Sequence, residues 1–177
     1  MKKIILVLVL FTVISVISDL KLQKIVIPKE AIRFRVIANS DSNTDQELKL
    51  KVKDNLNSEL QNILKNSNSI DESRFLIKNN IKKLSNSISN TLSDNNSTES
   101  FTINYGNNYF PEKEYQGVSY KEGEYESLVV KLGKGEGKNF WCVLFPPLCL
   151  IDEKKEKTSN IEYRMLIKDI LDKYFNN

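Results

Sequence analysis

The sequence contains no histidine, and this absence removes several kinds of chemistry at once. A Ser-His or Cys-His nucleophilic pair is excluded, and the commonest ligand of transition metals is missing. The only two cysteines, Cys142 and Cys149, are too few to fill the four positions of a structural zinc site. Catalysis would therefore depend on carboxylates, lysine, tyrosine or a lone cysteine, and we expect no metal and no cofactor.

The sequence also lacks a cluster of charges of one sign. It has 26 Lys and Arg against 23 Asp and Glu, and the two signs are interspersed along its 177 residues. A nucleic-acid-binding surface normally gathers basic residues on one face or stripe. We therefore expect no nucleic-acid partner. The length suits one domain, and the sequence has no internal repeat or long low-complexity linker.

An apolar run at residues 4–17 follows Lys2 and Lys3 and is bounded by Asp19. Its length fits the apolar core of a signal peptide and is short of the roughly 20 residues that span a bilayer. We predict that residues 1–18 are a signal peptide or an uncleaved N-terminal anchor. Residues 19–30 are then a connector, and residues 31–177 form a single α+β domain. Only the N-terminal segment is expected to contact the membrane.

Residues 125–149 hold the only tryptophan, both cysteines and three of the six glycines. Two apolar runs, residues 128–132 and 140–145, flank a glycine-spaced segment at residues 133–137. This pattern predicts an antiparallel hairpin at the centre of a sheet. A strand follows the glycines where a phosphate-binding loop would need a helix. Pro146 and Pro147 should end the second strand, because proline has no N–H for the sheet ladder.

Residues 32–37 alternate between apolar side chains and others, which predicts a strand with Ile32, Phe34 and Val36 on its buried face. Polar residues 39–45 then indicate the start of a helix near Asp45, with Thr44 and Glu47 at the spacing of a capping box. The same segment opens like a calcium loop. That match fails where Gln46 and Val52 replace the required Gly and Glu.

Apolar stripes predict two long helices, at residues 45–65 and 71–92, the second with Phe75 on its apolar face. Residues 101–105 should form a strand followed by a turn at residues 106–108, and a last helix should end the chain. The order of elements predicts an α+β fold. We expect a mainly antiparallel sheet, two long helices after the first strand and a C-terminal helix.

Three blocks of the sequence, in order, resemble the stage II sporulation protein R family of spore-forming Firmicutes. The first joins IRFRVIANSDS at residues 32–42 to DQELKLKVKD at residues 45–54. The others are GNNYFPEKEY at residues 106–115 and GKGEGKNFWCVLFPPLC at residues 133–149. The sequence departs from the family pattern at Phe140, where a second tryptophan is expected, and before Tyr125, where a proline is expected.

The resemblance implies a signalling protein that is made in the forespore and exported into the space between forespore and mother cell. There it would trigger a membrane-embedded aspartic protease that processes pro-sigma-E, and it would not itself be an enzyme. The alternative from another class is an exported hydrolase that uses carboxylates such as Asp41 and Asp45.

The candidate partner-contact residues are Asn39, Ser40, Asp41, Trp141, Pro146 and Pro147. Residues 39–41 are equally explained as the start of a helix. Trp141 is better explained as a core side chain than as an interface anchor. An exported chain with an even number of cysteines makes a disulfide between Cys142 and Cys149 more plausible. We expect two buried thiols, which pack as small apolar side chains, slightly more than the disulfide.

Overall fold

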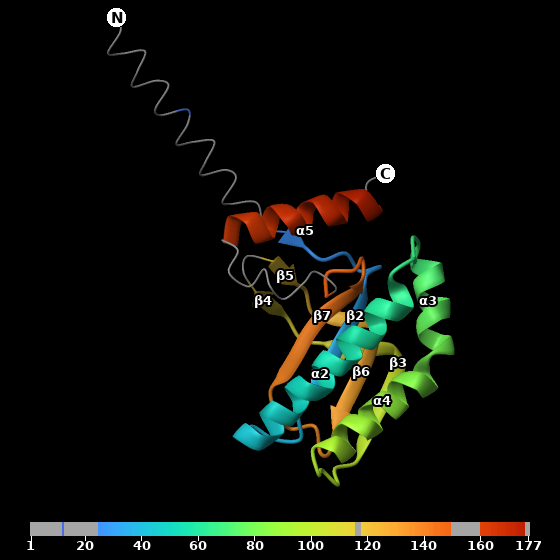
Figure 1. Ribbon diagram of the computed structural model, residues 1–177. Coiled ribbons are helices and arrows are strands. Elements are labelled where there is room, and N and C mark those ends of the chain that lie inside the picture. Colours follow the sequence, from blue (N-terminus) through green and yellow to red (C-terminus); the bar gives the residue numbers. More distant parts are fainter. Residues whose placement is uncertain (1–11, 13–24, 116–117, 150–159, 176–177) are drawn as a thin grey trace, which may run out of the picture.

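The computed structural model describes residues 12, 25–115, 118–149 and 160–175 of the chain. This part of the chain contains two sheets and four helices beyond residue 24 (Figure 1). The elements are β1 (Ile25–Val26), β2 (Ile32–Ile37), α2 (Asn43–Leu64), α3 (Ile70–Asn79), α4 (Ile81–Asp94), β3 (Phe101–Phe110), β4 (Lys113–Tyr115), β5 (Val118–Tyr120), β6 (Gly123–Leu132), β7 (Asn139–Phe145) and α5 (Asn160–Phe175).

The large sheet has the strand order β3-β6-β2-β7, with β2 parallel to β6 and antiparallel to β7. The predicted hairpin is therefore wrong, because β2 lies between the two strands that were expected to pair. Phe34 pairs with Leu128 on one side and with Cys142 on the other. The glycine-spaced segment is long enough to cross the end of β2, so β7 is an edge strand and β6 and β2 are central. The α+β class, the mainly antiparallel pairing and the C-terminal helix are confirmed.

One face of the large sheet is covered by helices and forms the main core. Alternation along β2 places Phe34 and Val36 on this face, and both are completely buried. Helix α2 lies across the sheet and α4 lies beside it (Figure 1). The expected apolar stripes supply the helical side of this core: Leu48, Val52, Leu56, Leu60, Leu64, Ile77, Leu84, Ile88 and Leu92.

Helix α2 begins two residues earlier than the sequence pattern suggested. Ser42 is the N-cap residue, and its hydroxyl accepts a hydrogen bond from the N–H of Asp45 at 3.2 Å. The predicted cap at Thr44 is therefore wrong, because the polar cluster offers several capping residues and Ser42 has the extended backbone that an N-cap needs.

The expected second helix is divided into α3 and α4 at Asn80. The N–H of Asn80 bonds to the carbonyl of Ile77, and its side-chain amide bonds to the carbonyl of Leu76. Phe75 is 66% exposed, contrary to expectation. It lies two residues from the buried Ile77, and at 3.6 residues per turn this places it on the opposite side of α3.

Strand β3 runs through the residues that were expected to form a turn. Gly106 pairs with Ser127, and Asn108 pairs with Tyr125 in the ladder between β3 and β6. The amide of Asn108 also donates to the hydroxyl of Ser127 at 2.9 Å. The turn residues are tolerated because a long partner strand supplies a continuous set of backbone bonds.

A smaller sheet of order β1-β5-β4 and helix α5 form a second layer at one end of the large sheet (Figure 1). Their shared core contains Ile27, Ala31, Val118, Val143, Leu148, Ile167 and Leu171. Strand β1 lies within the predicted connector, so that segment is not wholly irregular. The predicted signal or anchor at residues 1–18 lies outside the described residues apart from Thr12. Among the described helices, none has the length and apolar character needed to span a bilayer.

Candidate functional site

The glycine loop, residues 133–138, is bound to the end of β2. The N–H groups of Glu136 and Gly137 donate to the carbonyls of Asn39 and Ala38, each at 3.0 Å. Gly135 has a φ of 69°, in the left-handed region that favours glycine. A Cβ at Gly137 would collide with the Ser40 carbonyl. Glycine is thus required where the loop crosses β2.

Asn39 is held at both ends of its side chain. Its Oδ1 accepts from the N–H of Lys134 at 2.9 Å, and its Nδ2 donates to Asp45 at 3.1 Å. Ser40 donates its hydroxyl to the same carboxylate oxygen at 2.5 Å. Asp41 Oδ1 accepts from the N–H of Lys138 at 2.6 Å. The segment at residues 39–41 therefore ties β2, α2 and the glycine loop together.

These hydrogen bonds also change the pKa of the Asp45 carboxylate. The hydrogen bond from Ser40, with others from Asn39 and Ser42, holds the pKa of Asp45 below its usual value of 3.8. Glu99 lies close enough for its pKa to be raised, chiefly by burial and further by the charge of Asp45. No cluster of three or more His, Cys, Asp or Glu suited to a metal is present among the described residues.

The sheet face opposite the helices carries cations and aromatic rings. We call this cluster the cation–aromatic cluster: Arg33, Arg35, Phe110, Tyr125 and Trp141. The Arg33 guanidinium carbon lies 3.3 Å from the Tyr125 ring centroid, and the Arg35 carbon lies 5.1 Å from that of Trp141. Phe110 and Trp141 meet edge to face at 5.0 Å. Such contacts favour a cation over a ring face.

The two arginines differ in burial. Arg33 is 1% exposed, and its three side-chain nitrogens have no hydrogen-bond partner among the described residues. Burial lowers the pKa of Arg33, and the neighbouring Tyr125 and Tyr120 partly oppose this shift. Arg35 is partly buried, and burial lowers its pKa as well. With the Asn139 amide oriented to satisfy its neighbours, Arg35 donates to the Asn139 oxygen at 2.9 Å.

The six candidate contact residues do not form one surface. Asn39, Ser40 and Asp41 lie at the C-terminal end of β2, beside the glycine loop. Trp141 pairs with Arg35 near the middle of β2, whereas Pro146 and Pro147 follow Phe145, which pairs with Ile32 at its start. At about 3.3 Å per residue, the two ends of β2 are separated by most of the length of the strand.

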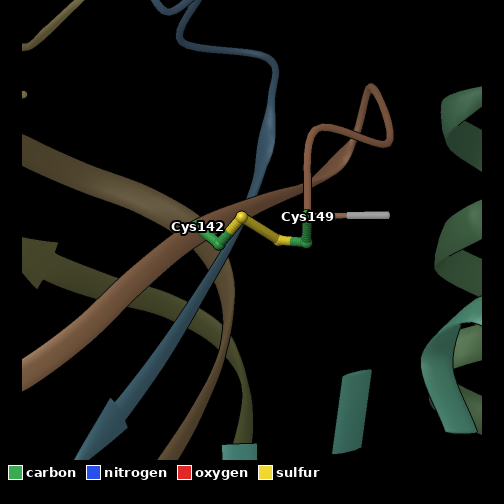
Figure 2. Close-up of a disulfide and its surroundings, with 2 residues drawn as sticks. All are labelled: Cys142 and Cys149. Atoms are coloured by element: carbon green, nitrogen blue, oxygen red, sulfur yellow. A yellow bond between two sulfur atoms is a disulfide. The ribbon is translucent and has the colours of Figure 1, made fainter. Parts of the chain in front are cut away.

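The structure joins Cys142 and Cys149 by a disulfide (Figure 2). Their Cα atoms are 5.6 Å apart, and the N–H of Cys149 bonds to the carbonyl of Val143 at 3.0 Å. The turn at residues 146–149 brings the chain back beside β7. The cysteines and both prolines therefore belong to one covalently closed turn.

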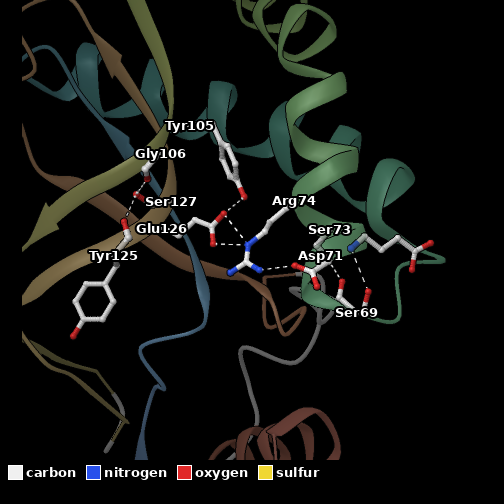
Figure 3. A network of polar contacts seen from close by, with 10 residues as sticks. Ser69, Asp71, Ser73, Arg74, Tyr105, Gly106, Tyr125, Glu126 and Ser127 are labelled. Carbon is white, nitrogen blue, oxygen red and sulfur yellow. Dashed lines mark hydrogen bonds and ion pairs between the residues drawn. The ribbon is translucent and has the colours of Figure 1, made fainter.

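A polar network between α3 and the large sheet had no counterpart in the sequence reading (Figure 3). Arg74 donates to Glu126 at 2.8 Å and to Asp71 at 2.7 Å, and Tyr105 donates to Glu126 at 2.7 Å. These acids raise the pKa of Arg74, while burial, followed by Glu126, raises that of Tyr105. The available signal was Glu126 itself, an acid on the same face of β6 as the buried Leu128 and Val130.

These features describe an α+β domain with a tied loop at one end of its sheet and a cation–aromatic cluster on the face away from the helices. The family model of stage II sporulation protein R matches residues 28–155. Stage II sporulation protein R of Bacillus subtilis strain 168 is 40% identical over 130 residues. The alignment covers 73% of this chain and 58% of that relative. No solved structure matches.

The chain belongs to the stage II sporulation protein R family, and this membership indicates a role in sporulation. The matched residues include β2, the glycine loop, the cation–aromatic cluster and the disulfide. The N-terminal segment precedes the matched region. The expectation that β2 has one buried face is wrong, because Arg33 on its other face is only 1% exposed. The clustering of Arg33 and Arg35 with aromatic residues depends on β3, β6 and β7, which are distant in sequence.

Proposed function

We propose that this protein is an exported signal of sporulation. It triggers a membrane-embedded aspartic protease, which then processes pro-sigma-E in the mother cell. The observation that carries the proposal is the family match over residues 28–155, a region that includes the whole large sheet, helices α2 to α4 and strands β4 and β5. The protein acts from the intermembrane space, either released from the forespore or tethered to the outer face of the membrane by residues 1–18.

The arrangement at the end of β2 suits a rigid binding protein. Asn39, Ser40 and Asp41 use their polar groups to fix the loop, and Asp45 accepts two of those bonds. A loop that is ordered before it meets a partner loses less conformational entropy on binding. This organisation supports recognition by a preformed surface.

The test is processing of pro-sigma-E in cells that contain the protease and its substrate. Full-length protein should start processing, and a form without residues 1–18, which stays in the cytosol, should not. Val7→Asp combined with Leu8→Asp should also abolish processing, because acids in the apolar core block export. A variant of the protease that lacks its catalytic aspartate is the control for the reaction. Equal processing by the cytosolic form would contradict action across the membrane.

The second candidate is a carboxylate-dependent hydrolase, and one observation favours it. One carboxylate oxygen of Glu99 is buried and has no hydrogen-bond partner among the described residues. Burial and the charge of Asp45 raise the pKa of Glu99, whereas hydrogen bonds lower the pKa of Asp45, and a catalytic acid and base also need pKa values moved apart. Asp41, which was the expected partner of Asp45, bonds instead to the glycine loop. The test is processing of pro-sigma-E with the variant Glu99→Gln. If the protein acts as a ligand, processing should stay at the wild-type level. If the signal depends on hydrolysis by this protein, processing should be abolished.

A further inference from the structure

We propose that the exposed part of the sheet face opposite the helices binds an acidic, extended segment of the protein partner. We call this surface the basic face: Arg35, Lys113, Val129, Lys131 and Trp141. This inference rests on the proposed function for the identity of the partner, the protease, and adds the surface and the chemistry by which it is recognised.

The basic face is assembled from four strands. Val129 of β6 pairs with Arg35 of β2, and Arg35 pairs with Trp141 of β7, so these three form one row across the sheet. Lys131 lies two residues after Val129 in β6 and therefore on the same face of the sheet. Its aliphatic carbons lie against Gly135 of the glycine loop. Lys113 of β4 places its ammonium group 5.2 Å from the Trp141 ring centroid. All five side chains are partly exposed.

The charge that the strands of the large sheet contribute to this face has one sign. The only acids in the four strands of the large sheet are Glu124 and Glu126, and both stand at alternate positions of β6. Glu126 contacts Arg74 of α3, so alternation places both acids on the helix side. Arg35 and Lys131 lie on the other side.

The cations of the basic face are not neutralised by the described part of the chain. None of Arg35, Lys113 and Lys131 takes part in an ion pair with a described carboxylate. Beneath them, the buried Arg33 has ring faces around it and no described hydrogen-bond acceptor. Arg33 and Arg35 are both packed against aromatic rings, where the dielectric constant is low. Their charges therefore strengthen the positive potential at the basic face. Carboxylates are the complementary groups.

The geometry favours a protein segment over a lipid surface. Arg35 is held between the rings of Phe110 and Trp141 and cannot extend freely toward a plane of headgroups. A strand-like segment can bring acidic side chains to Arg35 and Lys131 while it packs on Trp141 and Val129. Tryptophan and arginine are also the residues that most often dominate binding energy at protein interfaces.

The experiment compares binding to the protease in nanodiscs of neutral phosphatidylcholine with binding to empty nanodiscs, one set neutral and one containing anionic phosphatidylglycerol. The test variant is Lys113→Glu with Lys131→Glu, and the matched control is Lys82→Glu with Lys168→Glu. The control has the same change in charge at exposed positions of α4 and α5. We expect the test variant to bind the protease at least about tenfold more weakly than the wild type, and the control to bind as the wild type does.

Replacing the same two lysines by glutamine removes charge without reversing it and should give an intermediate loss. Circular dichroism and thermal unfolding of each variant distinguish lost binding from lost folding. Wild-type affinity of a folded test variant for the protease would overturn the proposal, as would a loss confined to the anionic empty nanodiscs. If the wild-type protein triggers processing while the test variant still binds, the proposed function stands and the basic face is wrong. If the wild type neither binds nor triggers processing, both fail.

Discussion

The two faces of the large sheet come from the same strands but are built differently. On the helix side, Phe34 and Val36 pack among leucines and isoleucines of α2 and α4. On the other side, Arg33 is equally buried but is surrounded by aromatic rings and lacks a described hydrogen-bond acceptor. Burial alone therefore does not identify the stabilising face. The helix side gains free energy by removing apolar surface from water, whereas the other side carries a desolvation cost.

The largest effect is expected on the helix side. Phe34→Ala removes a fully buried ring that packs edge to face with Phe140, and it should lower the free energy of unfolding by about 3–5 kcal/mol. Urea unfolding followed by circular dichroism measures this. Phe75→Ala on the exposed side of α3 is the matched control and should change stability by less than about 0.5 kcal/mol. Equal losses in the two variants would contradict the placement of this core.

Removing the disulfide between Cys142 and Cys149 should have the next largest effect on the free energy of unfolding. Replacing Cys142 and Cys149 by alanine opens a short loop and should cost about 2–3 kcal/mol on the chain-entropy estimate. Intact-mass measurement of protein purified without reductant and then denatured should show no alkylation, and alkylation of both cysteines after reduction. Alkylation before reduction would show that the two cysteines are free thiols.

A substitution on the cation–aromatic side of the sheet should lower the free energy of unfolding much less than Phe34→Ala does, or should raise it. Arg33→Met keeps an unbranched side chain of similar length and removes a buried charge without a described acceptor. We expect stability within about 1 kcal/mol of the wild type, or higher, because the desolvation cost disappears along with the cation–ring contacts. A loss as large as that of Phe34→Ala would show that the ring contacts outweigh desolvation, and it would remove the contrast between the faces.

The smallest expected effect is on the loss of folding stability at acidic pH. The pKa of Asp45 is lower in the folded protein than its usual value of 3.8, so the unfolded chain binds a proton first as the pH falls. The stabilisation is present above that value and is lost as the pH falls through the folded-state pKa. Asp45→Asn should therefore give a shallower loss of stability below about pH 4. Unfolding curves measured across this range test the prediction, and an unchanged slope would contradict it.

The sequence predicted those features that depend on local pattern. Leu48, Val52, Leu56 and Leu60 form the expected stripe, and the alternation of β2 separates Phe34 from the arginines as expected. The partner of each strand was not predictable in the same way. A glycine-spaced segment between two apolar runs is typical of a hairpin, but its length also lets the chain cross a third strand.

The site was less accessible to sequence reading for the same physical reason. Asn39 and Ser40 were recognised as polar residues at a strand end, but their bonds to Lys134 and Asp45 depend on where the glycine loop lies. Arg35, Lys113 and Trp141 are far apart in the sequence and meet only because β2 pairs with β7 and β4 lies nearby.

The central position of β2 has a consequence for the order in which the chain folds. Phe34 pairs with Leu128 and Cys142, so the middle of the large sheet cannot form until nearly all of the matched region is available to fold. Helices α2, α3 and α4 depend on contacts closer in sequence and can form earlier, but their apolar stripes need the sheet to cover them. Closing such long loops is slow relative to local contact formation. We therefore expect the cation–aromatic cluster to be completed last, when β7 closes the sheet and brings Trp141 beside Arg35.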